Sequence, residues 1–160
     1  MGTVISIQDL LAAARQVTAQ CEYCWAVTTS VDGTTSARVM GQLPSRPGED
    51  EWTKWFLINP HSRKAREIER SGHMSVAFGN ATLTRYAVLK GRAVLVVGDR
   101  SVIDGHWQQR WDSLFARGKE DPNVAFIKLE PDQMEICLEG MQRYAVVVRG
   151  SDRGWTIAPE

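Results

Sequence analysis

The chain of 160 residues is long enough for one domain with a sizeable hydrophobic core and no disulfide bonds. It carries 19 Lys and Arg and 19 Asp and Glu, and this formal net charge of zero argues against a general nucleic-acid binder or a polybasic membrane surface. The longest apolar runs have only five residues, too few for a membrane span or a signal peptide. Together with an odd number of Cys residues, these features predict one cytoplasmic domain over residues 1–160.

The first half of the chain shows both helix and strand patterns. Helices are predicted over 7–19 and 62–70, and strands over 24–29, 35–43 and 52–58. Ser6 is the expected cap of the first helix, and Asp32-Gly33 is a hairpin turn between the first two strands. Pro60 suits the first position of the second helix, and Gly72 suits its C-terminal end.

The second half is richer in strands. They are predicted over 74–78, 86–97, 124–130, 134–138 and 144–149, with a short last strand within 154–159 and a helix over 104–115. Trp107, Trp111 and Phe115 fall on one face of that helix. Because most strands follow one another through short links, the pattern predicts an antiparallel barrel of the α+β class rather than a doubly wound fold.

The segment over 55–68 carries the strongest chemical signal. An apolar strand leads through a turn into a helix whose first residues are Ser62, Arg63 and Lys64. Free backbone N–H groups at a helix start favour an anion, and a hydroxyl with two cations makes a compact phosphate clamp. The alternative is that these cations are solvated charges on a surface helix, although cations at this end oppose the helix dipole.

Four segments in fixed order carry a family resemblance. They are the strand–turn–strand ending in Arg38-Val39-Met40, the stretch WFLINPHSRKAREIERSGHMSVAF over 55–78, the stretch YAVLKGRAVLVVGD over 86–99, and the Trp-bearing segment before the break at 118–122. In this order the chain resembles the pyridoxamine 5'-phosphate oxidase-like, FMN-binding split-barrel family, and within it the general stress protein 26-like branch.

The resemblance implies an α+β, mainly β fold, namely an antiparallel six-stranded split β-barrel with flanking helices. It also implies a homodimer with two FMN sites at the subunit interface, so that each pocket is completed by the partner chain. The implied FMN contacts come from an early strand, the strand before the clamp, the helix start and the first residue of the long strand. In this sequence these residues are Arg38, Val39, Met40, Phe56, Leu57, Ile58, Ser62, Arg63, Lys64 and Tyr86.

The function implied by the resemblance is an FMN-dependent oxidoreductase with a small-molecule substrate. Since the flavin itself carries the redox chemistry, no catalytic acid or base is assigned. Ile58 stands where the family often has Thr, and the oxidase's C-terminal Arg-x-His signature is missing, so oxidation of pyridoxamine phosphate is not expected. The alternatives are a non-catalytic flavin-binding protein for stress or sensing, or a barrel that binds F420 or heme, with His61, His73 and His106 as candidate heme ligands.

Other motifs favour structural roles. Cys21 and Cys24 form a CxxC pair, but no second CxxC exists, so we expect Cys24 to pack in the barrel and predict no metal site. Trp107 and Trp111 are expected as core or dimer-interface anchors, with cover for a flavin ring as the weaker alternative. Trp25 is expected to pack, and the acidic run 49–51 to form a solvated loop. No dinucleotide-binding, P-loop, zincin or hydrolase-elbow motif is present.

Overall fold

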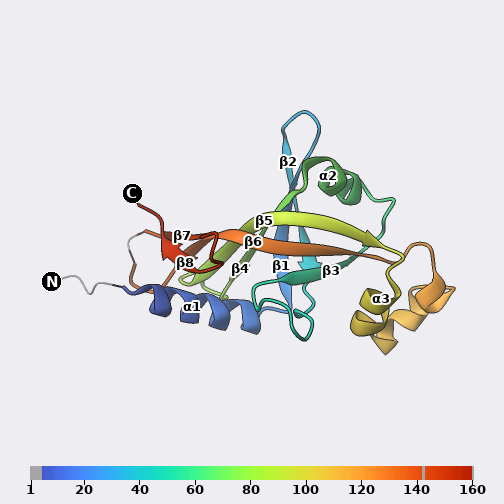
Figure 1. Ribbon diagram of the computed structural model, residues 1–160, viewed down its shortest axis with the longest axis horizontal. Coiled ribbons are helices and arrows are strands. Elements are labelled where there is room, and N and C mark those ends of the chain that lie inside the picture. The colour runs from blue at the N-terminus through green and yellow to red at the C-terminus, as the bar shows by residue number, and fades with distance from the viewer. Residues whose placement is uncertain (1–4, 142, 160) are drawn as a thin grey trace.

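A computed structural model describes residues 5–141 and 143–159 of the chain. It shows one antiparallel sheet with three α-helices around it (Figure 1). The strands are β1 (Tyr23–Thr29), β2 (Thr35–Gly41), β3 (Lys54–Ile58), β4 (His73–Gly79), β5 (Tyr86–Val97), β6 (Ala125–Cys137), β7 (Ala145–Arg149) and β8 (Trp155–Ile157). The α-helices are α1 (Ile7–Gln20), α2 (Arg63–Ser71) and α3 (Arg100–His106), and short 3₁₀ helices span Gln109–Ser113 and Gly118–Glu120.

Capping residues mark the start of α1 and the end of α2. Ser6 caps α1 and exchanges hydrogen bonds with Asp9 in a capping box, as the sequence predicts. The helix α2 ends at Gly72, whose left-handed φ of 69° suits a residue without a side chain. The helix α1 packs against β4, β5 and β6, whereas α2 packs against β1 and β5. None of the helices within residues 5–141 and 143–159 is both long and apolar enough to cross a bilayer.

Backbone pairing closes most of the sheet into a barrel. The strands follow the order β2-β1-β4-β5-β6, and β3 pairs with β6. A bridge between Leu43 and Trp55 then connects the chain beyond β2 to β3 and completes the circuit. The hairpin of β7 and β8 lies outside this circuit, at the end of the molecule where α1 begins (Figure 1).

The barrel splits along β6. Residues Ala125–Leu129 pair with β3, whereas Gln133–Ile136 pair with β7. The register with β5 shifts between Lys90 and Gly91, opposite Pro131. Because β6 changes partner at this point, the sheet has eight strands in all, of which six, β1 to β6, form the circuit of the barrel, and the β7–β8 hairpin was not part of the predicted six-stranded barrel. The two strands predicted over 124–130 and 134–138 are one strand, since a bulge absorbs the proline without ending the pairing.

Two hydrophobic clusters fill the fold. The larger cluster lies inside the barrel, beneath α1 and α2, and includes Phe56, Phe78 and Leu89. The smaller cluster gathers Trp55, Trp111 and Phe126 beneath α3 and the segment that follows it. As expected, Cys24 is buried in the larger cluster.

The predicted helix over 104–115 was wrong in its bounds and continuity. Asp99 caps α3, which ends before Trp107 because that residue adopts an extended conformation with φ −56° and ψ 133°. A separate 3₁₀ helix then places Trp111 edge-on to Trp107, with ring centroids 5.7 Å apart. The chain bends here so that both indoles reach the smaller cluster, which confirms them as packing residues.

Two surface expectations also differ from the structure. Trp25 is 56% exposed on the outer face of β1, so within this chain it does not pack as predicted. The acidic run 49–51 is not simply solvated, because each carboxylate has a cationic partner. Glu49 pairs with Lys128, Asp50 with Arg149 and Glu51 with Arg15.

Candidate functional site

The start of α2 forms the base of the candidate site. Ser62 is the N-cap, and its Oγ accepts a hydrogen bond of 3.3 Å from the backbone N–H of Ala65. The helix therefore begins at Arg63, and the prediction that Pro60 occupies its first position was wrong. The N–H groups of Arg63 and Lys64, in the first turn, have no carbonyl partner within the helix. These two N–H groups are therefore hydrogen-bond donors that a ligand at the helix start can use.

Three cations gather beside these donors. Arg63 reaches from α2 to β2, where its Nη2 donates to Ser36 Oγ at 3.3 Å. Arg38 lies two residues further along β2, on the same face as Ser36. Burial and the nearby Arg38 lower the pKa of Lys64, and burial lowers the pKa of Arg38, on which the positive charge of Arg63 also acts. We call Arg38, Arg63 and Lys64 the cation cluster.

Among residues 5–141 and 143–159, Glu67 is the one carboxylate within ion-pair distance of this cluster. It is only 5% exposed, and its Oε2 accepts a hydrogen bond of 2.5 Å from Thr28 Oγ1. Arg38 donates to the same Thr28 hydroxyl at 2.5 Å and lies 3.8 Å from Glu67 Oε2. Glu67 Oε1 is 3.6 Å from Arg63 Nε but has no hydrogen-bond partner. Three cations thus face one carboxylate, which leaves the site positively charged.

Glu67 and Thr28 are two site residues that the sequence pattern does not predict. The signal available for Glu67 is its position four residues after Arg63, because residues at that spacing share a helix face. Thr28 gives no comparable signal. Its role depends on the packing of α2 against β1, which brings together residues 39 positions apart.

The residues predicted to contact FMN from β2 and β3 differ in how far their side chains are exposed. Met40, Phe56 and Ile58 are buried in the larger cluster, and Leu57 packs against the smaller one. Val39 is 53% exposed on the outer face of β2, opposite Trp25 of β1. Since β2 is the terminal strand of the sheet path, its outer backbone edge has no strand partner among the described residues. Ligand contacts from this region would therefore come mainly from the backbone.

Tyr86 lies away from the cation cluster. It pairs with Gly79 at the far end of β4, whereas Thr28 adjoins the start of that strand, next to the pair Val27–Ser75. The separation is about five residues along the strand, or roughly 16 Å. Within one chain, the structure therefore does not bring Tyr86 together with Ser62, Arg63 and Lys64.

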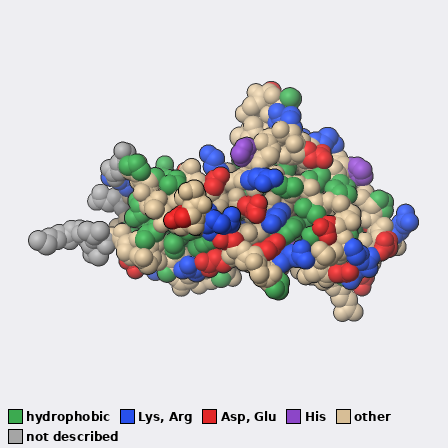
Figure 2. Space-filling model, in the orientation of Figure 1, with side chains coloured by type: hydrophobic (Ala, Val, Ile, Leu, Met, Phe, Trp, Pro, Cys, Tyr) green, Lys and Arg blue, Asp and Glu red, His purple; other side chains and the backbone are tan. Residues whose placement is uncertain are grey.

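A cavity of about 340 Å³ adjoins the cation cluster. It is lined by Ser30, Val31, Arg63, Arg66, Glu67 and Arg70. Elsewhere on the surface, acidic and basic side chains are interspersed over the face shown in Figure 2, in keeping with the zero net charge. The enrichment of arginine around this cavity is therefore local.

The three histidines lie on different parts of the fold. His61 and His73 are exposed, the first before α2 and the second at the start of β4. His106 is buried at the end of α3, between Trp55 and Phe126 at centroid distances of 4.9 and 5.5 Å. In the described part of the chain, no three His, Cys, Asp or Glu residues are placed to hold a metal ion.

Comparison with known proteins adds the family context. The family model for "Pyridoxamine 5'-phosphate oxidase like" matches residues 10–148. A pyridoxamine 5'-phosphate oxidase-related, FMN binding protein from Nostoc punctiforme is 13% identical, with a TM-score of 0.67 over 100% of both chains. A Clostridium acetobutylicum protein related to general stress protein 26 is also 13% identical, with a TM-score of 0.72 over 90% of this chain and 96% of that one.

A third similar structure is a heme binding protein from Mycobacterium smegmatis. It is 14% identical, with a TM-score of 0.65 over 91% of this chain and 60% of that chain. No curated protein matches the sequence. At these identities the structural likenesses show the split-barrel fold and leave the ligand open.

Proposed function

Because the chain belongs to the pyridoxamine 5'-phosphate oxidase-like family, we propose that it binds FMN with the cofactor phosphate at the start of α2. The observation that carries this proposal is the cation cluster of Arg38, Arg63 and Lys64, where Glu67, beside Arg38 and Arg63, is the one carboxylate that the described part of the chain supplies. A phosphate dianion reduces the repulsion among these cations and accepts hydrogen bonds from the free N–H groups of the first turn.

The residues at this site fit the phosphate end of FMN. The Ser62 hydroxyl accepts from Ala65 and still has its own proton to donate. Arg63 and Lys64 supply a planar fork and a compact charge, respectively. Glu67 orients Arg38 through Thr28, and its second oxygen lacks a donor that a ribityl hydroxyl can provide.

The unpaired edge of β2 fits the ring end of the cofactor. The backbone groups of Val39 point to this edge and can form hydrogen bonds with the polar rim of an isoalloxazine ring, whereas those of Met40 point toward Cys24 of β1. Phe56, Leu57 and Ile58 support the neighbouring strand β3 from within the two hydrophobic clusters. Their proposed part in binding is to hold the backbone in place, since little of their side-chain surface is accessible.

We propose that the chain is a flavin-dependent oxidoreductase that acts on a small molecule. Bound FMN supplies hydride or electron transfer, and the chain supplies position, charge and exclusion of water. The second candidate is a flavin-binding protein without turnover, active in stress or sensing, and the likeness to a general stress protein 26 relative favours it. Reduction of the bound flavin by NADH or NADPH distinguishes the two.

A homodimer follows from the same proposal. Tyr23, Trp25 and Val39 are each more than half exposed and lie on the outer face of the hairpin of β1 and β2. Burial of this apolar face against a second copy removes it from water. In such a dimer, the partner chain can supply the Tyr86 that lies too far away within one chain.

Heme and F420 remain alternative ligands of the barrel. Between these two, the likeness to a heme binding protein favours heme. Of the candidate axial ligands, His61 and His73 are accessible, whereas His106 is enclosed by aromatic rings. A Soret band on titration with heme supports that candidate, and its loss in H61A or H73A identifies the ligand.

The test of the FMN proposal is the visible spectrum of the protein after FMN has been added and the unbound part removed. We expect about one FMN per chain in the wild type and a loss of at least about 100-fold in affinity in R63A/K64A, because two charged phosphate contacts are removed. The matched control is R100A/K119A, which removes the same two charge types from an exposed ion-pair group around Asp104. Unchanged FMN affinity in R63A/K64A would refute the phosphate site.

A further inference from the structure

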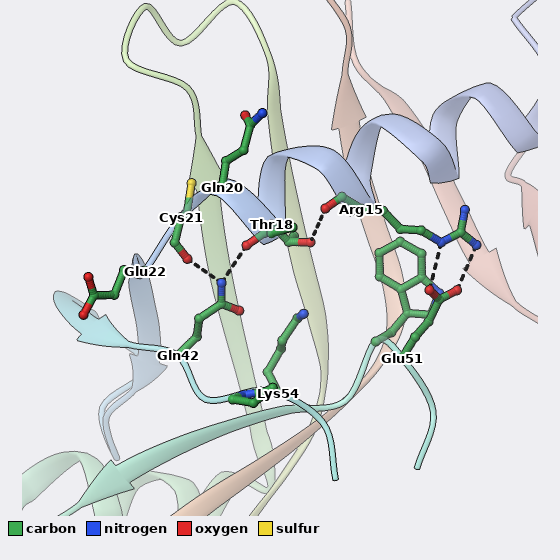
Figure 3. A pocket seen from close by; sticks show the side chains of 11 residues that line it. Arg15, Thr18, Gln20, Cys21, Glu22, Gln42, Glu51 and Lys54 are labelled. Carbon is green, nitrogen blue, oxygen red and sulfur yellow. Dashed lines mark hydrogen bonds and ion pairs between the residues drawn. The ribbon is translucent and has the colours of Figure 1, made fainter. Parts of the chain in front are cut away.

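A second cavity of the described chain lies away from the cation cluster. It has a volume of about 550 Å³ and opens between the C-terminal half of α1, the segment after β2 and the start of β3 (Figure 3). This volume falls within the range of about 300–1,000 Å³ that is typical of small-molecule sites. Ala19, Pro44 and Trp52 form apolar parts of its wall. The cavity is therefore large enough for a small organic ligand.

Lys54 points into this cavity from β3 toward α1 (Figure 3). The residue is only 9% exposed, yet it forms no hydrogen bond or ion pair with any described residue. Burial is the main cause that lowers its pKa, and Glu51 opposes this effect from a distance. Most of the side chain is buried, while its ammonium has no partner and is accessible from the cavity, so a counter-ion from outside the chain would offset the cost of holding this charge here.

Three other polar side chains of the cavity wall, those of Arg15, Glu51 and Gln42, already have partners within the chain. Arg15 donates two hydrogen bonds of 2.8 Å to the carboxylate of Glu51, and its guanidinium lies 5.4 Å from the centre of the Trp52 ring. Gln42 uses its amide nitrogen to donate to the carbonyls of Thr18 and Cys21, at 2.6 and 2.5 Å. Of the two cations among the described residues of the cavity wall, Arg15 is paired with Glu51 and Lys54 is free to bind a ligand.

These contacts also limit the charge of that ligand. One free cation matches one negative charge, and the carboxylates of Glu22 and Glu51 on the cavity wall disfavour a second. Gln42 has both amide hydrogens engaged and offers the ligand only its oxygen. The apolar wall beside Trp52 favours a ligand with an apolar body.

We propose that this cavity is a binding site for a small organic monocarboxylate, with the Lys54 ammonium as its counter-ion and Trp52 as the wall for its apolar part. The site is separate from the proposed FMN site, since the two share no lining residue. It gives the protein a second small-molecule site, for a substrate fragment or an effector.

The test is calorimetric titration of the protein with benzoate, with its neutral analogue benzamide and with inorganic phosphate. We expect wild-type protein to bind benzoate at least about tenfold more tightly than either of the others, because only benzoate combines one charge with an apolar ring. This comparison needs no variant and so does not depend on the folding of a mutant.

The K54M variant then tests the counter-ion. Methionine keeps the unbranched apolar stem, and the loss of an unpaired buried charge is not expected to lower the melting temperature. We expect benzoate affinity to fall at least about tenfold in K54M and to stay unchanged in K119M, where the lysine pairs with Asp104 outside the cavity. It should also stay unchanged in R63A/K64A, so a failed FMN proposal leaves this one standing.

Three results would overturn the proposal. They are the absence of benzoate binding up to about 10 mM, equal affinity for benzoate and phosphate, and equal benzoate affinity in wild type and K54M. Each of them contradicts a carboxylate held by Lys54.

Discussion

At the residue scale, Gln42 shows how one side chain can complete a helix. Its amide nitrogen donates to the carbonyl oxygens of Thr18 and Cys21, which end α1 without partners in the helix. The helix has no basic residue in its last turn, so this amide is the main cap at its C-terminal end. The sequence gives no hint of it, because the amide and the helix are separated by more than 20 residues.

We expect Gln42→Ala to lower the free energy of unfolding by about 1–3 kcal/mol, because two partly buried carbonyl groups lose their donor. Urea denaturation measures this change. The matched control is Gln109→Ala, an exposed glutamine in the 3₁₀ helix Gln109–Ser113, for which a change within about 0.5 kcal/mol is expected. If both variants are equally stable, Gln42 does not cap the helix.

Only part of the candidate site can be predicted from neighbouring residues in the sequence. Ser62, Arg63 and Lys64 stand together in the sequence, so their convergence at a helix start can be predicted from local pattern alone. Arg38 comes from a distant strand, and its place beside Lys64 was available only through the family resemblance. Glu67 joins them because α2 turns its buried face toward Thr28, and that orientation is a property of packing.

At the element scale, the pair of β5 and β6 depends on Gly91. A Cβ atom at this position would lie 2.7 Å from Pro131 Cα and even closer to the Glu130 carbonyl oxygen. These backbone atoms form the bulge through which β6 changes partner from β3 to β7, so they have little room to move. Glycine is therefore required by the close approach of two backbones.

We expect Gly91→Ala to destabilise the protein by about 2–4 kcal/mol, or to prevent folding, because the bulge must shift to admit a methyl group. The melting temperature of purified protein measures the effect. Lys90→Ala is the control, since this neighbouring side chain is exposed and a change within about 0.5 kcal/mol is expected. A Gly91→Ala protein as stable as wild type would mean that the bulge is deformable.

Some elements follow from local pattern and others do not. The strand over Tyr86–Val97 and the helix start at Ser6 were predicted correctly, because periodicity and capping act over a few residues. The helix over 104–115 was wrong, because the aromatic spacing of Trp107 and Trp111 mimics a helical face. The two indoles in fact meet across a bend whose shape is set by the smaller hydrophobic cluster.

At the scale of the whole molecule, the outer face of β1 and β2 is an apolar surface that a single chain leaves exposed to solvent. Trp25 and Val39 face each other across the two strands, 56% and 53% exposed, and Tyr23 extends the apolar surface. We expect wild-type protein to be a dimer and Trp25→Glu to weaken it at least about 30-fold, because each interface loses the aromatic anchor twice and gains two charges.

Sedimentation equilibrium measures this change in association, and Leu114→Glu is the control for adding a charge at an exposed apolar residue away from the sheet. If the partner chain completes the pocket, the Trp25→Glu variant should also retain less FMN than the wild type, because it forms less dimer. A dimer that persists in Trp25→Glu places the subunit interface elsewhere.

The change of partner along β6, from β3 to β7, affects how its amide hydrogens exchange with solvent. The strand is bonded to β5 along one edge, and to β3 and then β7 along the other. Neither the β7–β8 hairpin nor β3 shields the whole strand, so local opening at one end leaves the other end protected. Deuterium should therefore enter the amides of Leu129 and Met134, two fully buried residues on either side of the bulge, at two independent rates, each set by the opening of its own half of the strand. Equal rates for the two amides would instead indicate that the whole strand opens as one unit.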